Sequence, residues 1–133
     1  MWESDPVVAM RAADAVEKIS LQKPALLAPF AGELLGLMAE AEQPELRWHL
    51  ALLAPRLPLT SVERARAAAN LRRYLADRSS IVRTFALQAL TDLSAHDPAL
   101  RDEVVELLHD AARSGTAAMK ARARKLLKQL GLH

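Results

Sequence analysis

The stretch IVRTFALQALTDL, residues 81–93, recurs in outline three more times along the chain. The related stretches are VVAMRAADAVEKI at 7–19, ELRWHLALLAPRL at 45–57 and AMKARARKLLKQL at 118–130. Apolar side chains stand at the same positions in all four copies, which follow one another at steps of 36 to 38 residues. Within each copy these positions follow a period of 3.6 residues, which predicts an amphipathic helix.

A second helical segment is expected between neighbouring copies. Thr60 and Glu63 have the spacing of a capping box, and Asp97 before Pro98 places an N-cap residue ahead of a first-turn proline. These second segments are expected at 24–41, 60–76 and 98–113. The sequence therefore predicts about seven helices joined by turns that are too short to separate two domains.

Single residues predict local details of these helices. Pro55 lies in the copy at 45–57, where it removes a backbone donor and clashes with the preceding turn, so we expect that helix to bend or end early. Gly32 and Gly36 stand one turn apart and predict the close approach of another helix. Ala86, in the middle of its apolar stripe, predicts close contact between two helix layers.

The composition agrees with an all-helical protein. Ala and Leu dominate the apolar residues, and both lose little side-chain freedom in a helix. Cysteine is absent from the sequence, which excludes disulfides and thiolate metal sites. The sequence contains neither an apolar run long enough to span a membrane nor the pattern of a signal peptide. We therefore expect a cytoplasmic protein with no membrane partner.

A two-helix unit repeating about every 37 residues predicts an α-solenoid, because one helix pair cannot bury its apolar stripe alone. We expect a single domain over residues 1–133. It would consist of an unpaired leading helix at 5–20, followed by helix pairs at 24–57, 60–94 and 98–130.

Two stretches, LADRSSIVRTFALQAL at 75–90 and QPELRWHLALL at 43–53, resemble HEAT repeats. The second helix of a HEAT repeat begins with Val-Arg and continues with small and large apolar residues at these spacings. The resemblance covers almost the whole chain. It implies a right-handed solenoid of stacked antiparallel helix pairs.

The resemblance also implies a ladder of ion pairs. HEAT repeats often carry an Asp in the turn between their helices and an Arg after the Val, and these residues pair between neighbouring repeats. Asp77 and Arg83 match this pattern, and Arg47 occupies the Arg position one copy earlier. The turn at Ser114–Gly115 carries no acid, so the implied ladder is partial.

Motifs for catalysis or cofactor binding are not apparent. The histidines lack the spacing of a metal site, the glycines do not form a phosphate-binding loop, and the sequence holds no G-x-S-x-G elbow. We expect a protein that is not an enzyme and has no catalytic residue, metal ligand or cofactor.

Trp48 indicates where a partner would bind. At 100° per residue it lies opposite the apolar stripe of its helix, with Leu52 one turn further on the same side. Polar Thr84 and Gln88 take these positions in the copy at 81–93. An apolar face directed away from the core predicts a docking patch for a protein partner. The patch is expected to comprise Met10, Arg11, Trp48, His49, Leu52, Arg56, Thr84 and Gln88.

Two alternatives to a protein-docking patch remain open. In the first, tight curvature of the stack or the Met1–Trp2 segment covers Trp48 within the chain. In the second, the protein binds nucleic acid, because some HEAT-like proteins hold duplex DNA with basic residues of their inner helices. A weak anion site is expected at Arg122, Lys125 and Lys128.

Acidic residues argue against the second alternative. Asp14, Glu17 and Asp92 occupy equivalent positions on the other inner helices, whereas a groove that follows phosphates needs one sign of charge. We therefore expect a protein partner before nucleic acid, with self-association as a further possibility.

Overall fold

The computed structural model of the chain describes residues 11, 14–16, 18–19 and 21–132. Every regular element formed by these residues is a helix, which confirms the all-α prediction. The described residues between 11 and 22 are helical. The later elements are η1 (Pro24–Phe30), α2 (Ala31–Glu40), α3 (Pro44–Leu53), η2 (Ala54–Arg56), α4 (Ser61–Tyr74), α5 (Ser80–Leu93), η3 (Ser94–His96), α6 (Pro98–Ser114) and α7 (Ala117–Gln129).

The helix boundaries follow the capping residues of the sequence. Thr60 accepts a hydrogen bond from the Glu63 amide at 3.2 Å, and the Glu63 carboxylate accepts one from the Thr60 amide at 2.9 Å. The predicted capping box is thereby confirmed. Asp97 caps α6 by accepting from the Leu100 amide at 3.2 Å, again as predicted.

Prolines end or divide two of the predicted helices. Helix α3 ends at Leu53, Pro55 lies in the 3-10 helix η2, and the backbone is extended at Leu57. The predicted early end of this helix is confirmed. The single helix expected at 24–41 is instead divided into η1 and α2. Pro29 lies inside η1 and lacks a backbone donor, so the α-helix begins only at Ala31.

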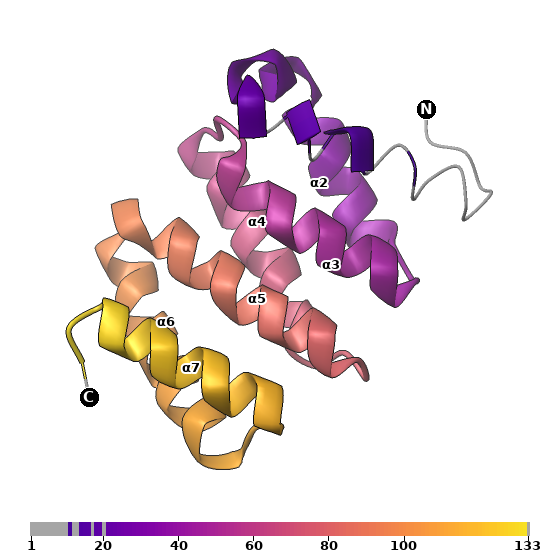
Figure 1. Cartoon of the computed structure of the whole chain (residues 1–133). Coiled ribbons are helices and arrows are strands. Elements are labelled where there is room, and N and C mark those ends of the chain that lie inside the picture. The colour runs from indigo at the N-terminus through magenta and orange to yellow at the C-terminus, as the bar shows by residue number, and fades with distance from the viewer. Residues whose placement is uncertain (1–10, 12–13, 17, 20, 133) are drawn as a thin grey trace.

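The helices form two layers (Figure 1). Helices α3, α5 and α7, which carry the repeated motif, lie side by side toward the viewer, with α3 against α5 and α5 against α7. Helices α2, α4 and α6 lie behind them. Helix α5 is central, since it contacts α3, α4, α6 and α7.

The core has the register that the repeat predicts. Leu50, Ala86 and Ala123 occupy equivalent positions in three copies, and each side chain is 1 % exposed or less. Ala86 and Ala123 take little room between the two layers at this position, whereas Leu50 fills more of it. The equivalent residue of the first copy, Ala12, lies outside the described residues.

Two expectations about side-chain environment are wrong. Thr84 was expected on the outer face of its helix, but both Thr84 and Thr91 are buried at 8 % exposure. Their hydroxyls donate to backbone carbonyls one turn earlier, at 2.7 and 2.8 Å, which satisfies them inside the protein. Gly32 and Gly36 do not mark a close helix contact, because a Cβ at either position would meet nothing within 4 Å.

Asp77 forms one ion pair between neighbouring repeats, of the kind that the resemblance implies. Asp77 pairs with Arg47 of α3 rather than with Arg83. Burial raises the pKa of the Asp77 carboxyl, but the Ser79 amide and the Arg47 guanidinium lower it by more. The net pKa therefore lies below its ordinary value, so Asp77 is ionised and paired at neutral pH.

Candidate functional site

A groove crosses the layer formed by α3, α5 and α7. Its cavity of about 300 Å³ is lined by Ala51, Leu52, Pro55, Arg56, Phe85, Gln88, Ala89, Asp92 and Arg122. We call these residues the α3–α5–α7 groove. The structure thus brings together four predicted site residues that are distant in sequence, namely Leu52, Arg56, Gln88 and Arg122.

Helix geometry explains how these side chains converge. On α5, Phe85, Gln88 and Asp92 follow one another at spacings of three and four residues, so they share one face. Pro55 ends α3 beside this face, which places Arg56 in the turn of η2 at the groove. Arg122 reaches the groove from α7, the neighbour of α5 on its other side.

A chain of polar contacts runs along one edge of the groove. Arg122 Nη1 donates to Gln88 Oε1 at 3.0 Å, and Gln88 Nε2 donates to Asp92 Oδ1 at 3.0 Å. The Arg122 guanidinium also lies 5.9 Å from the centre of the Phe85 ring, a cation–π contact. These contacts hold an arginine, an amide and a carboxylate in fixed positions beside an aromatic ring.

Desolvation raises the pKa of the Asp92 carboxyl above its ordinary value. The hydrogen bond from Gln88 and the charges of Arg56 and Arg122 act in the opposite direction. The groove therefore contains both signs of charge, and its acidic group is partly removed from water.

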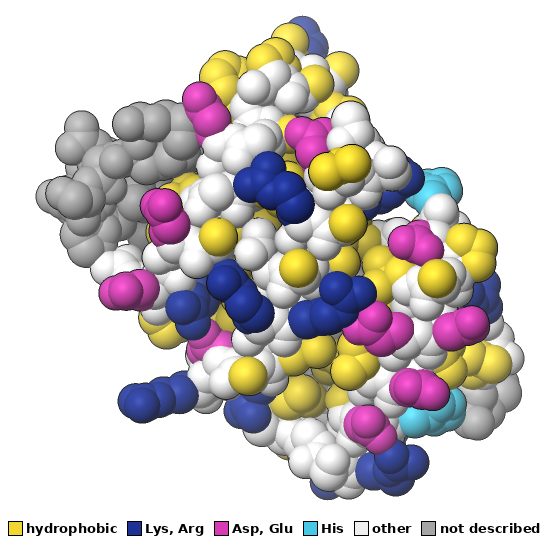
Figure 2. All heavy atoms as spheres, turned by 180° about the vertical axis from the view of Figure 1, so that it is seen from behind, with side chains coloured by type: hydrophobic (Ala, Val, Ile, Leu, Met, Phe, Trp, Pro, Cys, Tyr) yellow, Lys and Arg dark blue, Asp and Glu magenta, His cyan; other side chains and the backbone are white. Residues whose placement is uncertain are grey.

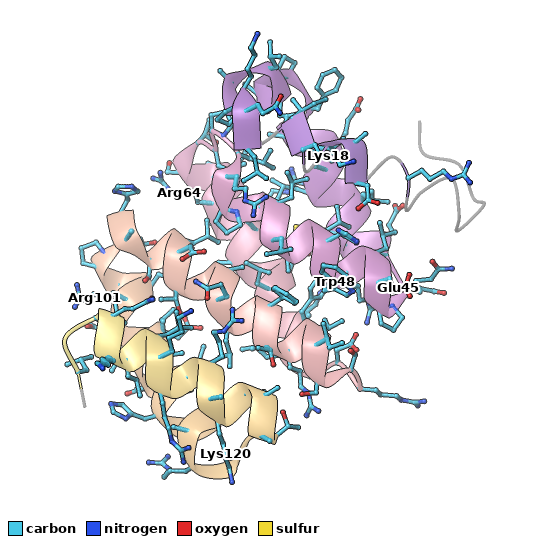
Figure 3. The ribbon with its side chains drawn as sticks, viewed as in Figure 1. Lys18, Glu45, Trp48, Arg64, Arg101 and Lys120 are labelled. Atoms are coloured by element: carbon cyan, nitrogen blue, oxygen red, sulfur yellow. The ribbon has the colours of Figure 1, made fainter. Side chains whose placement is uncertain are left out.

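Trp48 lies between α3 and α5 (Figure 3). The expectation that its ring points into water is therefore wrong. The ring is half-buried and packs against the core. It stacks on Phe85 with ring centres 5.2 Å apart and on His49 at 3.9 Å. A side chain opposite the core stripe of its own helix thus meets the neighbouring helix of the same layer. The chain itself covers part of Trp48, and the covering residue is Phe85.

The rest of the predicted docking patch is divided. His49 lies 3.5 Å from Asp14, and its side chain is 11 % exposed, so it belongs to the contact with the N-terminal helical segment. Arg11 is exposed in that segment, away from the lining of the groove. Thr84 is buried, as described above, and Met10 lies outside the described residues.

The predicted anion site is divided in the same way. Arg122 lines the groove and is held by Gln88, whereas Lys125 and Lys128 are exposed side chains of α7 that do not line it. Of these three residues, Arg122 alone lines the groove.

Phe85 and Asp92 line the groove but are not among the site residues predicted from the sequence. Phe85 takes the place of His49 in the aligned copies, one position after the place of Trp48. The aligned copies therefore carry aromatic residues at neighbouring positions, Trp48 and His49 in one copy and Phe85 in the next. This pattern could have indicated that Trp48 and Phe85 meet between the two helices. Asp92 was noted only as a charge unfavourable to nucleic acid.

The opposite face of the molecule has a different character (Figure 2). Lys and Arg gather across its middle, and Asp and Glu lie on both sides of them. Helix α4 carries Arg64, Arg66, Arg72 and Arg73, and Arg72 forms a two-bond ion pair with Glu103 of α6 at 2.6 and 2.8 Å. Arg73 donates instead to the backbone carbonyl of Ala39 at the end of α2, at 3.3 Å.

Within the described residues, no cluster of three or more His, Asp or Glu side chains is placed to hold a metal ion. None of the described helices is long and apolar enough to cross a bilayer. Comparison with protein-family models, with curated proteins and with solved structures finds no match to the chain.

Proposed function

We propose that this chain is a short right-handed α-solenoid of HEAT-like repeats that serves as a non-catalytic scaffold for a protein partner. The proposal is supported by the repeat of about 37 residues and by the side-by-side placement of α3, α5 and α7, which carry the repeated motif. The alternation of helices between two layers also agrees with it.

The single observation that carries the binding proposal is the α3–α5–α7 groove. Leu52, Phe85 and Ala89 supply an apolar floor, while Arg122 and Asp92 are held at its edge. An apolar pocket with a few fixed polar groups suits a partner that inserts one apolar side chain and adds hydrogen bonds around it. The mixed charge of the groove is unsuited to a run of phosphates.

The test replaces Leu52 by arginine, which fills the groove with a charged side chain. Val62→Arg is the matched control, because Val62 is an exposed apolar residue of α4, 70 % exposed and in the other layer. A photo-crosslinking residue at Gln88 should capture one discrete protein in cells. Leu52→Arg should abolish this crosslink, and Val62→Arg should leave it intact.

Other products of the same experiment distinguish the alternatives. A crosslink to a second copy of the chain, with a dimer in light scattering, would mean self-association. Retention on duplex DNA that falls with salt and survives Leu52→Arg would favour the nucleic-acid alternative. An unchanged crosslink in Leu52→Arg would show that the groove is not the binding surface.

A further inference from the structure

Arg83 of α5 carries a buried donor without an acceptor. Its Nε atom is shielded from solvent, and none of the described residues accepts a hydrogen bond from it. Unsatisfied donors of this kind are rare inside proteins, and they are most costly on charged groups. The equivalent arginine one repeat earlier has an acceptor for its Nε and a carboxylate for its Nη1.

Arg47 shows how the equivalent residue is satisfied one repeat earlier. Both arginines stand four residues after the N-cap of their helices. Arg47 Nε donates to the carbonyl of Ala41 at 2.7 Å, and its Nη1 pairs with the carboxylate of Asp77. Asp77 belongs to the next inter-helix turn, and its side chain is 6 % exposed.

The turn after α6 lacks the corresponding acid. Ser114 stands two residues before the N-cap of α7, as Asp77 stands two residues before the N-cap of α5. The Ser114 hydroxyl donates to the carbonyl of Asp110 within its own helix, at 3.0 Å. The turn after α6 therefore supplies no carboxylate to Arg83, although the charge of Asp77 on the preceding turn acts on this arginine.

A cavity of about 380 Å³ lies at this place. Arg83 lines it together with apolar side chains from four segments, namely Leu75, Leu87, Leu107 and Met119. The N-cap of α7 also borders the cavity, and the N-terminal end of a helix favours negative charge. The cavity thus places the Arg83 guanidinium, whose buried Nε lacks an acceptor, beside an apolar wall.

We propose that this cavity binds a carboxylate joined to a short apolar group. The carboxylate pairs with Arg83 in the way that Asp77 pairs with Arg47, and the apolar group contacts the wall formed by Leu75, Leu87 and Leu107. A free carboxylic acid and the carboxyl end of a peptide share this chemistry. The site is separate from the α3–α5–α7 groove, so it adds a second ligand to the proposed scaffold.

Asp110 also lines the cavity and opposes an anion there. It pairs with Arg113 one turn later on α6, and its side chain is 63 % exposed. Water and the paired arginine therefore screen its charge. Replacing Asp110 by asparagine should leave carboxylate affinity unchanged or raise it.

The first test is a titration of ¹⁵N-labelled protein with hexanoate, followed through the Arg83 Nε–H resonance. The resonance should shift and saturate, and hexanamide, which lacks the charge, should bind at least tenfold more weakly. N-acetyl-leucine serves as the probe for a peptide end. Stronger binding of hexanoate identifies a free acid as the ligand, and stronger binding of N-acetyl-leucine identifies a peptide end.

The second test supplies the missing acid from the chain itself. Ser114→Asp should place a carboxylate beside Arg83, raise the melting temperature and weaken hexanoate binding at least tenfold. Ser114→Asn is the neutral control and should keep the wild-type affinity. Arg83→Gln should also lose binding. The proposal is overturned if neither probe binds the wild type, or if Ser114→Asp binds hexanoate as well as Ser114→Asn does.

Discussion

Tyr74 of α4 donates a hydrogen bond of 2.6 Å from its hydroxyl to the backbone carbonyl of Met38 in the last turn of α2. Carbonyls in the last turn of a helix have no donor within the helix. Asn70, one turn before Tyr74, donates to the carbonyl of Leu35 at 3.2 Å. Tyr74 therefore satisfies a carbonyl at the end of α2 and Asn70 adds a bond further inside it, so polar as well as apolar contacts tie these two helices together.

The first prediction concerns the titration of Tyr74. Burial raises the pKa of its hydroxyl to about 12, against an ordinary value of 10.0. Because the pKa is higher in the folded than in the unfolded protein, the contribution of Tyr74 to the free energy of unfolding is complete below pH 10. This contribution is lost as the pH rises toward 12. Two pKa units correspond to about 3 kcal/mol.

Tyr74 is the single tyrosine of the chain, so absorbance near 295 nm reports its ionisation directly. The midpoint in native protein should lie near 12. Tyr74→Phe should lose about 1–2 kcal/mol at neutral pH and also lose the alkaline decline in stability that this group causes. A native midpoint near 10 would contradict the buried hydrogen bond.

The second prediction concerns Asp77. Because its side chain is buried and paired with Arg47, Asp77→Asn should lower the free energy of unfolding by about 3 kcal/mol. Its pKa is lowered in the folded state, so its contribution is present above the unfolded pKa near 4 and is lost as the pH falls below it. Urea denaturation between pH 7 and pH 3 measures both effects.

Glu103 provides the comparison for Asp77. Its ion pair with Arg72 is exposed, with side chains 45 % and 38 % accessible. Glu103→Gln should therefore cost no more than about 1 kcal/mol. Equal losses for the two substitutions would mean that the Asp77 pair is as well hydrated as the surface pair.

The third prediction compares two glycines. A methyl group at Gly36, in the middle of α2, would meet nothing within 4 Å, so Gly36→Ala should stabilise the protein by about 1 kcal/mol. At Gly115 the same methyl group would lie 2.6 Å from the Ala111 carbonyl and 2.8 Å from the Met119 Cβ. Gly115→Ala should therefore destabilise. Thermal unfolding should shift in opposite directions for the two variants.

The fourth prediction concerns the stack of Trp48 on Phe85. Trp48→Ala should cost about 2 kcal/mol, because the half-buried ring packs against the core. A double-mutant cycle with Phe85→Ala should give a coupling of about 0.5–1.5 kcal/mol. Urea midpoints of the four proteins measure it, and strict additivity would show that the rings do not interact.

The fifth prediction concerns the small core position of the repeat. Ala86 has no exposed surface, so Ala86→Leu should overpack the space between the layers and cost about 1–3 kcal/mol. Urea midpoints check this value. An unchanged midpoint would mean that the layers separate to admit the larger side chain.

The repeat in the sequence predicted the helices and the core register because apolar spacing within one helix reports which face meets the other layer. It could not predict the contacts made within a layer. Trp48 and Thr84 stand opposite the core stripe of their helices, yet Trp48 meets Phe85 and Thr84 is buried. The angular position of a residue on one helix shows which side faces the other layer. It does not show which side faces the next helix of the same layer.

The candidate site was predictable only in part for the same reason. Leu52, Arg56, Gln88 and Arg122 were identified from single helices, and the structure brings them together at the groove. Phe85 was missed because its partner lies on another helix. Likewise, the turn residues indicated an ion pair for Asp77, but whether its arginine lies on the same helix pair or on the preceding one depends on how the pairs stack.

The enclosure of α5 by four other helices has a consequence for cooperativity. Local unfolding in the middle of the molecule would separate α5 either from α3 and α4 or from α6 and α7. Either separation would expose buried side chains such as Val82, Leu87 and Leu90. Local unfolding around α5 therefore requires more free energy than fraying at the two ends of the helix stack. Unlike a long repeat array, in which segments melt one after another, this chain should unfold as one unit built around α5.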